Sequence, residues 1–164
     1  MDQVLKAREE LWTSVDGVPD EVVRRANSGN WSMMDVLEHL QLVDQLVLRV
    51  IKDALSKPPV TDQIQANPME TALDRTNKLN APDSLTPKGV LRNLDDAHQQ
   101  LAVSREQLLS FVSLIDTDVL RSHGATHPRF GMLSAEQWLQ FVGLHERRHI
   151  AQIEEMKDEF NRDE

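Results

Sequence analysis

The sequence of 164 residues contains no cysteine. Without a thiol the chain can form no disulfide, offers no thiolate nucleophile and cannot hold a metal ion through sulfur. The absence of cysteine indicates nothing about compartment, because a protein without thiols is indifferent to its redox surroundings. These three kinds of chemistry are therefore excluded.

Long apolar runs and excess positive charge are also missing. No apolar run approaches the roughly 20 residues that a membrane-spanning helix needs, and the segment Met1–Lys6 lacks the basic and then apolar pattern of a signal peptide. Lysine and arginine number 18 against 27 aspartates and glutamates, and the resulting net charge of −9 disfavours binding to nucleic acid. The sequence therefore predicts a cytoplasmic protein that binds neither a membrane nor nucleic acid.

Length and composition indicate one globular domain over residues 1–164. Apolar residues make up 40% of the chain and charged residues 27%, which is an ordinary mixture for a folded protein. A chain of this length buries enough surface to fold without a disulfide or a structural metal.

Hydrophobic residues recur with a helical spacing along most of the chain. This pattern predicts helices over about 2–16, 32–57, 86–115 and 134–160, and hence an all-α fold, a four-helix bundle. A long connection over 57–86, with a short helix at about 70–79, joins the second and third helices, and a loop covers 116–133. The expected helix starts are the capping boxes Ser32/Asp35 and Ser134/Gln137 and the pair Thr86–Pro87.

Three of the six histidines fall where apolar core residues are expected. His39 continues the apolar face of the second helix, and His145 and His149 continue that of the fourth. Residues four apart share a helix face, so His145 and His149 can reach one metal ion. Two interpretations stay open. Each ring is a hydrogen-bonded core histidine, or the second and fourth helices are neighbours and the three rings hold a divalent metal together.

The segment from His145 to His149 also fits H-E-x-x-H, the zinc-peptidase pattern in which the glutamate, here Glu146, is the general base. Only 15 residues follow His149, and the acidic side chains among them have the pattern of a solvated helix face. Nothing upstream resembles a strand edge that could hold a peptide. Peptidase activity is therefore the least favoured interpretation, and Glu146 is a poorly supported base.

Several short motifs together resemble the DinB/YfiT-like superfamily over essentially the whole chain. The similarity depends on the three spaced histidines in combination, because each motif alone is short and degenerate. The motifs are Trp31-Ser32 followed by His39, Ala81-Pro82 with Pro87, His127-Pro128…Gly131…Leu133, and Trp138…His145…His149…Gln152-Ile153.

The resemblance implies a four-helix bundle, often a homodimer, with His39, His145 and His149 holding a divalent metal. Zinc or nickel is favoured, with iron and manganese as alternatives. Members of known activity are transferases or isomerases that use a low-molecular-weight thiol, and many others have no assigned reaction. The resemblance thus specifies the site better than the substrate.

Five further residues are weaker candidates. His127 either lines the mouth of the site or is an ordinary loop residue. Arg105 either meets an anionic substrate or extends its side chain to water, and Asp35 either caps its helix or orients the His39 ring. His98 and His123 have the pattern of residues on a helix flank and in a loop.

The leading functional interpretation is a metal-dependent enzyme, a transferase or hydrolase, that acts on a small molecule. Three neutral imidazoles leave a coordination position open, which distinguishes catalytic from structural zinc sites. The alternative is a bundle that binds metal or serves as a scaffold without turnover.

Overall fold

The computed structural model describes residues 1–26, 31–64, 68–76 and 80–162. Helices dominate this part of the chain, and the one sheet in it is a two-stranded hairpin. The α-helices and strands are α1 (Asp2–Val15), α2 (Asp20–Val23), α3 (Met33–Leu55), α4 (Leu94–Ser113), α5 (Thr117–Ser122), β1 (Gly124–His127), β2 (Gly131–Ser134) and α6 (Ala135–Arg162). The connection between α3 and α4 carries three short 3₁₀ helices, η1 (Thr61–Gln63), η2 (Met69–Leu73) and η3 (Asp83–Leu85).

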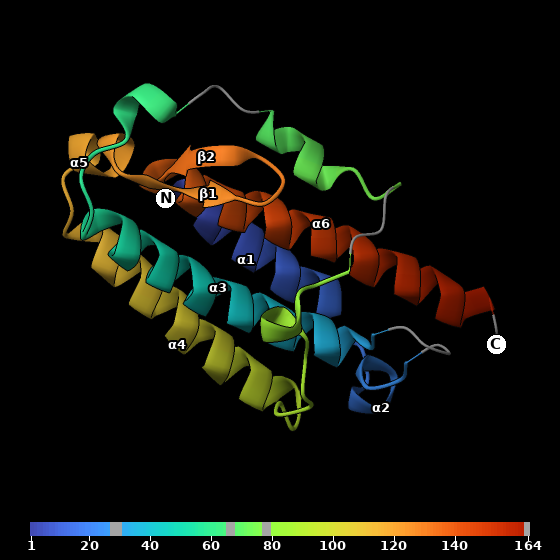
Figure 1. The fold of residues 1–164 in the computed structure, drawn as a ribbon. Coiled ribbons are helices and arrows are strands. Elements are labelled where there is room, and N and C mark those ends of the chain that lie inside the picture. Colours follow the sequence, from blue (N-terminus) through green and yellow to red (C-terminus); the bar gives the residue numbers. More distant parts are fainter. Residues whose placement is uncertain (27–30, 65–67, 77–79, 163–164) are drawn as a thin grey trace.

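The long helices α1, α3, α4 and α6 form the bundle that the sequence predicts. α6 packs against both α1 and α3, and α3 also packs against α4 (Figure 1). The predicted neighbourhood of the helices that carry His39 and the His145/His149 pair is therefore confirmed. None of the described helices is both long enough and apolar enough to cross a membrane.

Two clusters of buried apolar residues fill the bundle, and buried charges lie between them. Along three helices the order is an apolar residue of one cluster, a charged residue, and an apolar residue of the other cluster. These series are Val4–Arg8–Leu11 in α1, Leu108–Arg105–Leu101 in α4 and Val142–Glu146–Ile153 in α6.

Two predicted helix starts are confirmed by their capping boxes. Ser32 Oγ accepts a hydrogen bond from the Asp35 backbone N–H at 3.1 Å, while the Asp35 carboxylate accepts from the Ser32 backbone N–H at 2.8 Å. Ser134 and Gln137 make the same reciprocal pair at the start of α6, at 3.1 and 2.9 Å. Local sequence is sufficient to determine these two starts.

The predicted start of the third helix at Thr86–Pro87 is wrong. The helix begins at Leu94, where the Asn93 side chain caps it by accepting a hydrogen bond from the Asp96 backbone N–H at 2.8 Å. The preceding residues are instead attached to α3, because the buried Glu38 carboxylate accepts the backbone N–H groups of Lys88 and Val90 at 2.6 and 2.9 Å. The Glu38 side chain, 50 residues from Lys88 in sequence, thus binds backbone N–H groups of the segment predicted to begin the helix.

The prediction of a plain loop over 116–133 is also wrong, because this segment contains α5 and the β1–β2 hairpin. The strands pair antiparallel from Gly124 opposite Ser134 to His127 opposite Gly131. Gly131 has a φ of 72°, which favours glycine at the turn. Strands of four residues are too short to show a clear alternating pattern in the sequence.

Within the long connection, the predicted short helix at 70–79 corresponds to η2 at Met69–Leu73, and residues 77–79 lie outside the described part of the chain. The structure also contains α2, which the sequence analysis does not predict. η2 packs on α6 and η3 packs on α3, so the connection lies across the two helices that carry the histidines.

Candidate metal centre

His39, His145 and His149 converge inside the bundle. The Nε2 atom of His145 lies 2.9 Å from Nε2 of His39 and 3.2 Å from Nε2 of His149. His39 and His149 are buried and His145 is half-buried, and one ligand atom from each ring lies within 4.8 Å of the others. These three residues form the potential metal-binding group found among the described residues.

Hydrogen bonds at Nδ1 fix which nitrogen of two rings is free to bind a cation. His39 Nδ1 donates to the Leu85 carbonyl at 2.8 Å, and His149 Nδ1 lies 2.8 Å from Oε1 of Gln152, which accepts its proton. A neutral imidazole that carries its proton on Nδ1 has a lone pair on Nε2. Such partners commonly orient metal-binding histidines, and here both lone pairs are directed toward the centre of the cluster.

Burial keeps the cluster neutral. It is the largest cause of the lowered pKa of His39, His145 and His149, and for His149 it contributes to a pKa of about 3. Mutual repulsion among the rings lowers the pKa of His145 and His149 further. At neutral pH the rings therefore carry no charge, which is the form that a metal ion requires.

The spacing of the nitrogens suits one divalent cation. Tetrahedral bonds of about 2.0–2.1 Å place two ligand nitrogens about 3.3 Å apart. The two separations from His145, 2.9 and 3.2 Å, are close to that value, and all three ligand atoms lie within 4.8 Å of one another. Three nitrogen ligands would leave a fourth position open for water or substrate.

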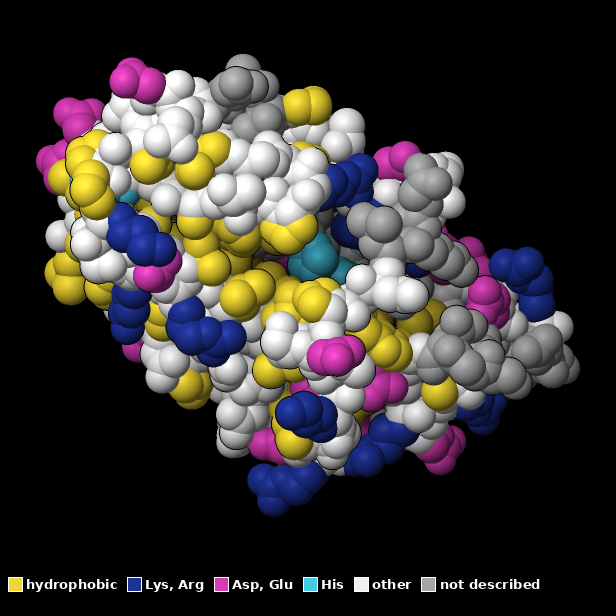
Figure 2. Space-filling view, viewed as in Figure 1, with side chains coloured by type: hydrophobic (Ala, Val, Ile, Leu, Met, Phe, Trp, Pro, Cys, Tyr) yellow, Lys and Arg dark blue, Asp and Glu magenta, His cyan; other side chains and the backbone are white. Residues whose placement is uncertain are grey.

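A cavity of about 610 Å³ contains the exposed side of this cluster. Figure 2 shows a histidine side chain at the bottom of a hollow, with hydrophobic side chains around it and basic ones on one border. The walls come from α3 and the residues just before it, α6, the hairpin and the connection, and they include Trp31, Val43, Leu85, Phe130, Trp138 and Phe141. The volume is within the range of about 300–1,000 Å³ that is usual for small-molecule sites.

His127 lines this cavity from β1. Its Nδ1 accepts hydrogen bonds from the backbone N–H groups of Arg129 and Phe130 at 3.1 and 3.3 Å, so the proton of the neutral ring is on Nε2. Burial, and then the charge of Arg129, lower the pKa of His127 to about 4. Of the two interpretations of His127, the structure supports the one that places it at the site. The Phe141 ring contacts the His127 and His145 rings in tilted arrangements, with centroid distances of 4.7 and 5.1 Å.

Glu146 does not face the histidine cluster. It is fully buried, and its two carboxylate oxygens accept hydrogen bonds from Arg8 Nε at 2.5 Å and from Arg105 Nη2 at 2.9 Å. Both oxygens are thus occupied by guanidinium groups, which removes the structural basis for a general base in an H-E-x-x-H peptidase.

Both interpretations of Arg105, contact with an anionic substrate and extension to water, are wrong. The side chain is buried and bonds the carboxylates of Asp44 and Glu146 and the Val4 carbonyl. Burial alone would lower the pKa of Arg105, but the two carboxylates outweigh burial and raise it. The position on an apolar stripe indicated burial, whereas the two acidic partners lie 61 and 41 residues away in sequence.

The remaining candidates lie away from the cluster. Asp35 serves its capping box, and the His39 ring is oriented by Leu85 rather than by this carboxylate. The His98 ring stacks on Trp12 with centroids 3.5 Å apart. His123 Nδ1 lies 3.0 Å from the Val119 carbonyl in α5.

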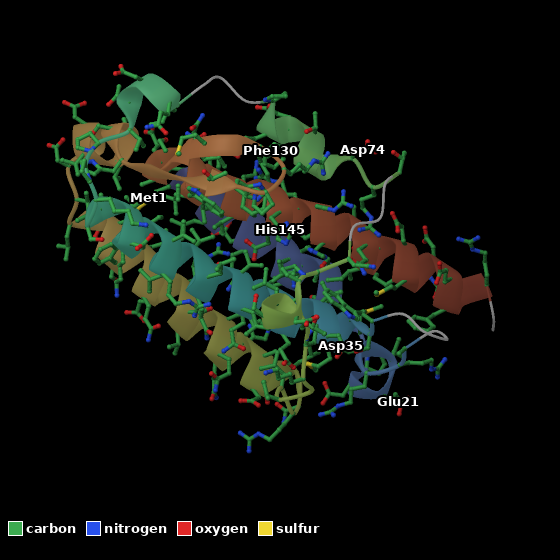
Figure 3. All side chains as sticks on the ribbon, in the orientation of Figure 1. Met1, Glu21, Asp35, Asp74, Phe130 and His145 are labelled. Carbon is green, nitrogen blue, oxygen red and sulfur yellow. The ribbon has the colours of Figure 1, made fainter. Side chains whose placement is uncertain are left out.

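Sequence reasoning missed the four arginines that line the cavity, at positions 25, 75, 129 and 148. Arg75 lies in the connection, Arg129 in the turn of the hairpin, and Arg148 on α6 between the two histidines of that helix. Figure 3 shows His145 and Phe130 near the middle of the molecule and Asp74, the neighbour of Arg75, near its edge. The position of Arg129 directly after His127-Pro128 was a sequence signal that could have placed it near the site. No such signal was available for Arg75, because its place in the cavity wall depends on how the connection folds.

Comparison with known proteins agrees with this architecture. The model of the DinB superfamily matches residues 3–153. The chain is also similar to the uncharacterized protein YuaE of Bacillus subtilis (strain 168), with 35% identity over 159 residues and coverage of 96% of each chain.

Proposed function

Because the chain belongs to the DinB superfamily, we propose that it is a metal-dependent enzyme that acts on a small molecule. His39, His145 and His149 hold one divalent cation, and the adjoining cavity receives the substrate. Zinc or nickel suits three imidazole ligands, while iron and manganese remain alternatives because availability also determines which metal is bound.

The convergence of the three Nε2 atoms is the observation that supports this proposal. Two of the lone pairs, on His39 and His149, are directed at His145. The ring of His145 has at most one Nε2 proton and can therefore satisfy only one of these lone pairs. A shared cation satisfies all three nitrogens at once, which separates a metal site from three independent core histidines.

The residues around the cluster have distinct roles in this proposal. Leu85 and Gln152 hold two ligand rings in orientation, and the aromatic walls limit the access of water. His127 presents an N–H donor from β1 to a polar group of the substrate. A divalent ion with an open coordination position makes bound water or a bound thiol nucleophilic near neutral pH.

The chain has no cysteine, so it cannot supply a thiol nucleophile of its own. We propose a low-molecular-weight thiol as cosubstrate, which makes the enzyme a transferase, with hydrolysis by water as the second possibility. A homodimer is part of the same proposal, and light scattering on the purified protein tests it.

The decisive experiment measures bound metal per chain after identical dialysis. His39→Ala, His145→Ala and His149→Ala should each lose most of the metal, whereas His98→Ala and His123→Ala should retain it. Full metal content in His39→Ala would refute the assignment. Assays of thiol transfer and hydrolysis on the metal-loaded wild-type protein then separate an enzyme from a bundle that binds metal without turnover.

A further inference from the structure

The cavity next to the histidine cluster is a basic region on an acidic protein. Its described lining contains four arginines, at positions 25, 75, 129 and 148, against two glutamates, at positions 155 and 159. The formal surplus is two positive charges with the histidines neutral, while the whole chain has a net charge of −9. A positively charged cavity on a negatively charged protein favours an anionic ligand over an uncharged one.

Backbone carbonyl groups hold two of these arginines in place. Arg129 Nη2 donates to the Thr71 carbonyl at 2.8 Å, and Arg148 Nη1 donates to the carbonyls of Ala72 and Asp74. For Arg129, the carbonyl oxygen fixes the position of the guanidinium group without cancelling its charge. Arg129 takes part in no ion pair within the described residues, and its guanidinium lies over the Phe130 ring, 5.3 Å from the centroid.

Arg75 is held by a carboxylate rather than by backbone carbonyl groups. Arg75 makes a two-point ion pair with Glu155, with Nε–Oε1 and Nη2–Oε2 distances of 2.8 and 2.7 Å. Its Nη1 also reaches Oε1 of Gln152 at 3.4 Å, the same oxygen that receives the proton of His149 Nδ1. Together, Arg75, Arg129 and Arg148 form what we call the basic wall of the cavity. Through Arg75 this wall contacts Gln152, the residue that orients the His149 ring.

Arg75, Arg129 and Arg148 line the same cavity. The carbonyls that hold Arg129 and Arg148 belong to Thr71, Ala72 and Asp74, which lie close together in the chain directly before Arg75. Guanidinium groups at a shared cavity wall form a strong site for carboxylate or phosphate oxygens, because they offer paired donors in a planar array.

We propose that Arg129 and Arg148, beside the Arg75–Glu155 ion pair, bind an oxyanion group of the substrate, a carboxylate or a phosphate, and so direct its reactive part to the histidine cluster. This inference rests on the proposed function, since it names the substrate class of the same site. The remaining wall is aromatic, with Trp31, Phe130 and Phe141 among the lining residues. The substrate is therefore a small molecule that carries an anionic group beside an apolar portion.

Binding of simple probes to the full-length protein tests this proposal. Isothermal titration calorimetry is performed with succinate, with inorganic phosphate and with succinamide, the uncharged analogue of succinate. Metal-free wild-type protein is used, so that no bound metal attracts the anion. We expect succinate or phosphate to bind at least tenfold more tightly than succinamide, and the tighter of the two anions identifies the group that the substrate carries.

Variants locate the binding. Arg129→Gln and Arg148→Gln should each weaken binding of the anion about tenfold, and Arg129→Lys, which keeps the charge but loses the paired donors, should be intermediate. Arg121→Gln is the matched control, because Arg121 is on the surface and pairs with Glu136 outside the cavity lining. Circular dichroism confirms that each variant is folded, and Arg129 is exposed, so its replacement should not disturb the core.

The outcomes for the two proposals are separate. If succinamide binds as well as the anions, or if the Arg129 and Arg148 variants bind like Arg121→Gln, the anion site is refuted even where the wild type takes up metal. If the wild type takes up no metal but binds anions through the arginines, the metal proposal fails and the anion site stands. In His149→Gln we expect metal binding to be lost and anion binding to be retained within about threefold.

Discussion

Arg105 Nη2 donates a hydrogen bond to Oε2 of Glu146 at 2.9 Å in the interior of the bundle. Glu146 directly follows a histidine of the candidate metal centre, yet its carboxylate belongs to a separate network. In that network Arg8 and Arg105 each bond both Glu146 and Asp44, which gives two positive and two negative buried charges. The pairs join α1, α3, α4 and α6, so the network contributes to holding the four helices in register.

Replacing Glu146 should therefore affect stability and leave the metal site intact. Glu146→Gln removes a buried negative charge and leaves Arg8 and Arg105 with one carboxylate between them. Breaking a buried ion pair in this way typically costs about 3–5 kcal/mol. We expect urea unfolding to show a loss of this size, while metal content per chain remains that of the wild type.

Glu136→Gln is the control for this substitution. Its partner Arg121 is exposed, and a surface pair of this kind contributes about 0–1 kcal/mol. A stable Glu146→Gln protein that has lost its metal would show that the carboxylate acts in the site after all.

Orientation of the His149 ring should contribute measurably to metal affinity. Gln152→Leu removes the acceptor of the Nδ1 proton at 2.8 Å and leaves the ring free to adopt other orientations. Loss of such a partner commonly weakens metal binding about 10–100-fold. Competition with a chromogenic chelator measures the change, and Gln140→Leu, an exposed position on the same helix, should have no effect. Equal affinity in the two variants would contradict the role given to Gln152.

Acid should destabilise the metal-free protein through its buried histidines. The pKa of His149 is about 3 in the folded state and about 6.5 in an unfolded chain, so below pH 6.5 the unfolded state binds a proton that the folded state does not. The stability is fully present above pH 6.5 and is lost as the pH falls from 6.5 toward 3, with a slope of at most about 1.4 kcal/mol per pH unit for one histidine.

Urea unfolding at pH 7.5, 6.0 and 5.0, in the presence of a chelator, measures this loss. The carboxylates titrate in both proteins, so the comparison with His149→Gln isolates the histidine. The wild type should lose more stability than His149→Gln over this range. Parallel pH profiles would show that His149 takes up its proton without disturbing the fold.

Replacing Glu38 should weaken metal binding through the connection between α3 and α4. Its carboxylate holds the backbone of Lys88 and Val90, in the segment that directly follows Leu85, the residue whose carbonyl orients His39. Glu38→Gln leaves one of these N–H groups without an acceptor, which should cost about 1–3 kcal/mol in stability and should also weaken metal binding. Glu21→Gln, at an exposed position of α2, is the control. Unchanged metal affinity in Glu38→Gln would show that Leu85 is positioned by other contacts.

The features that the sequence predicts correctly are those encoded locally. Capping boxes at Ser32 and Ser134 mark helix starts within four residues, and the i, i+4 spacing of His145 and His149 places both rings on one face of a helix. His39 joins this pair once the apolar faces of α3 and α6 pack together. For this reason the sequence alone is sufficient to predict the bundle and the histidine cluster.

The features that sequence analysis missed depend on partners far apart in the chain. Thr86–Pro87 has the local pattern of a helix start, but the contact of the following residues with Glu38 overrides it. Arg105 and Glu146 have no neighbours in sequence that reveal their pairing. The basic wall of the cavity likewise depends on how the connection and the hairpin fold back onto α6.

The candidate metal ligands and two of the arginines of the basic wall belong to different parts of the fold. All three histidines are on α3 and α6, whose positions are fixed by the core of the bundle, whereas Arg75 and Arg129 are on a connection and a hairpin turn at the surface. Surface segments accept insertions and substitutions more readily than core helices. On the proposed function, relatives with this architecture would acquire new substrates by changing the connection and the hairpin while keeping the same three histidines. Exchanging residues 57–93 and 124–134 between two such proteins is then a direct route to engineering a different specificity.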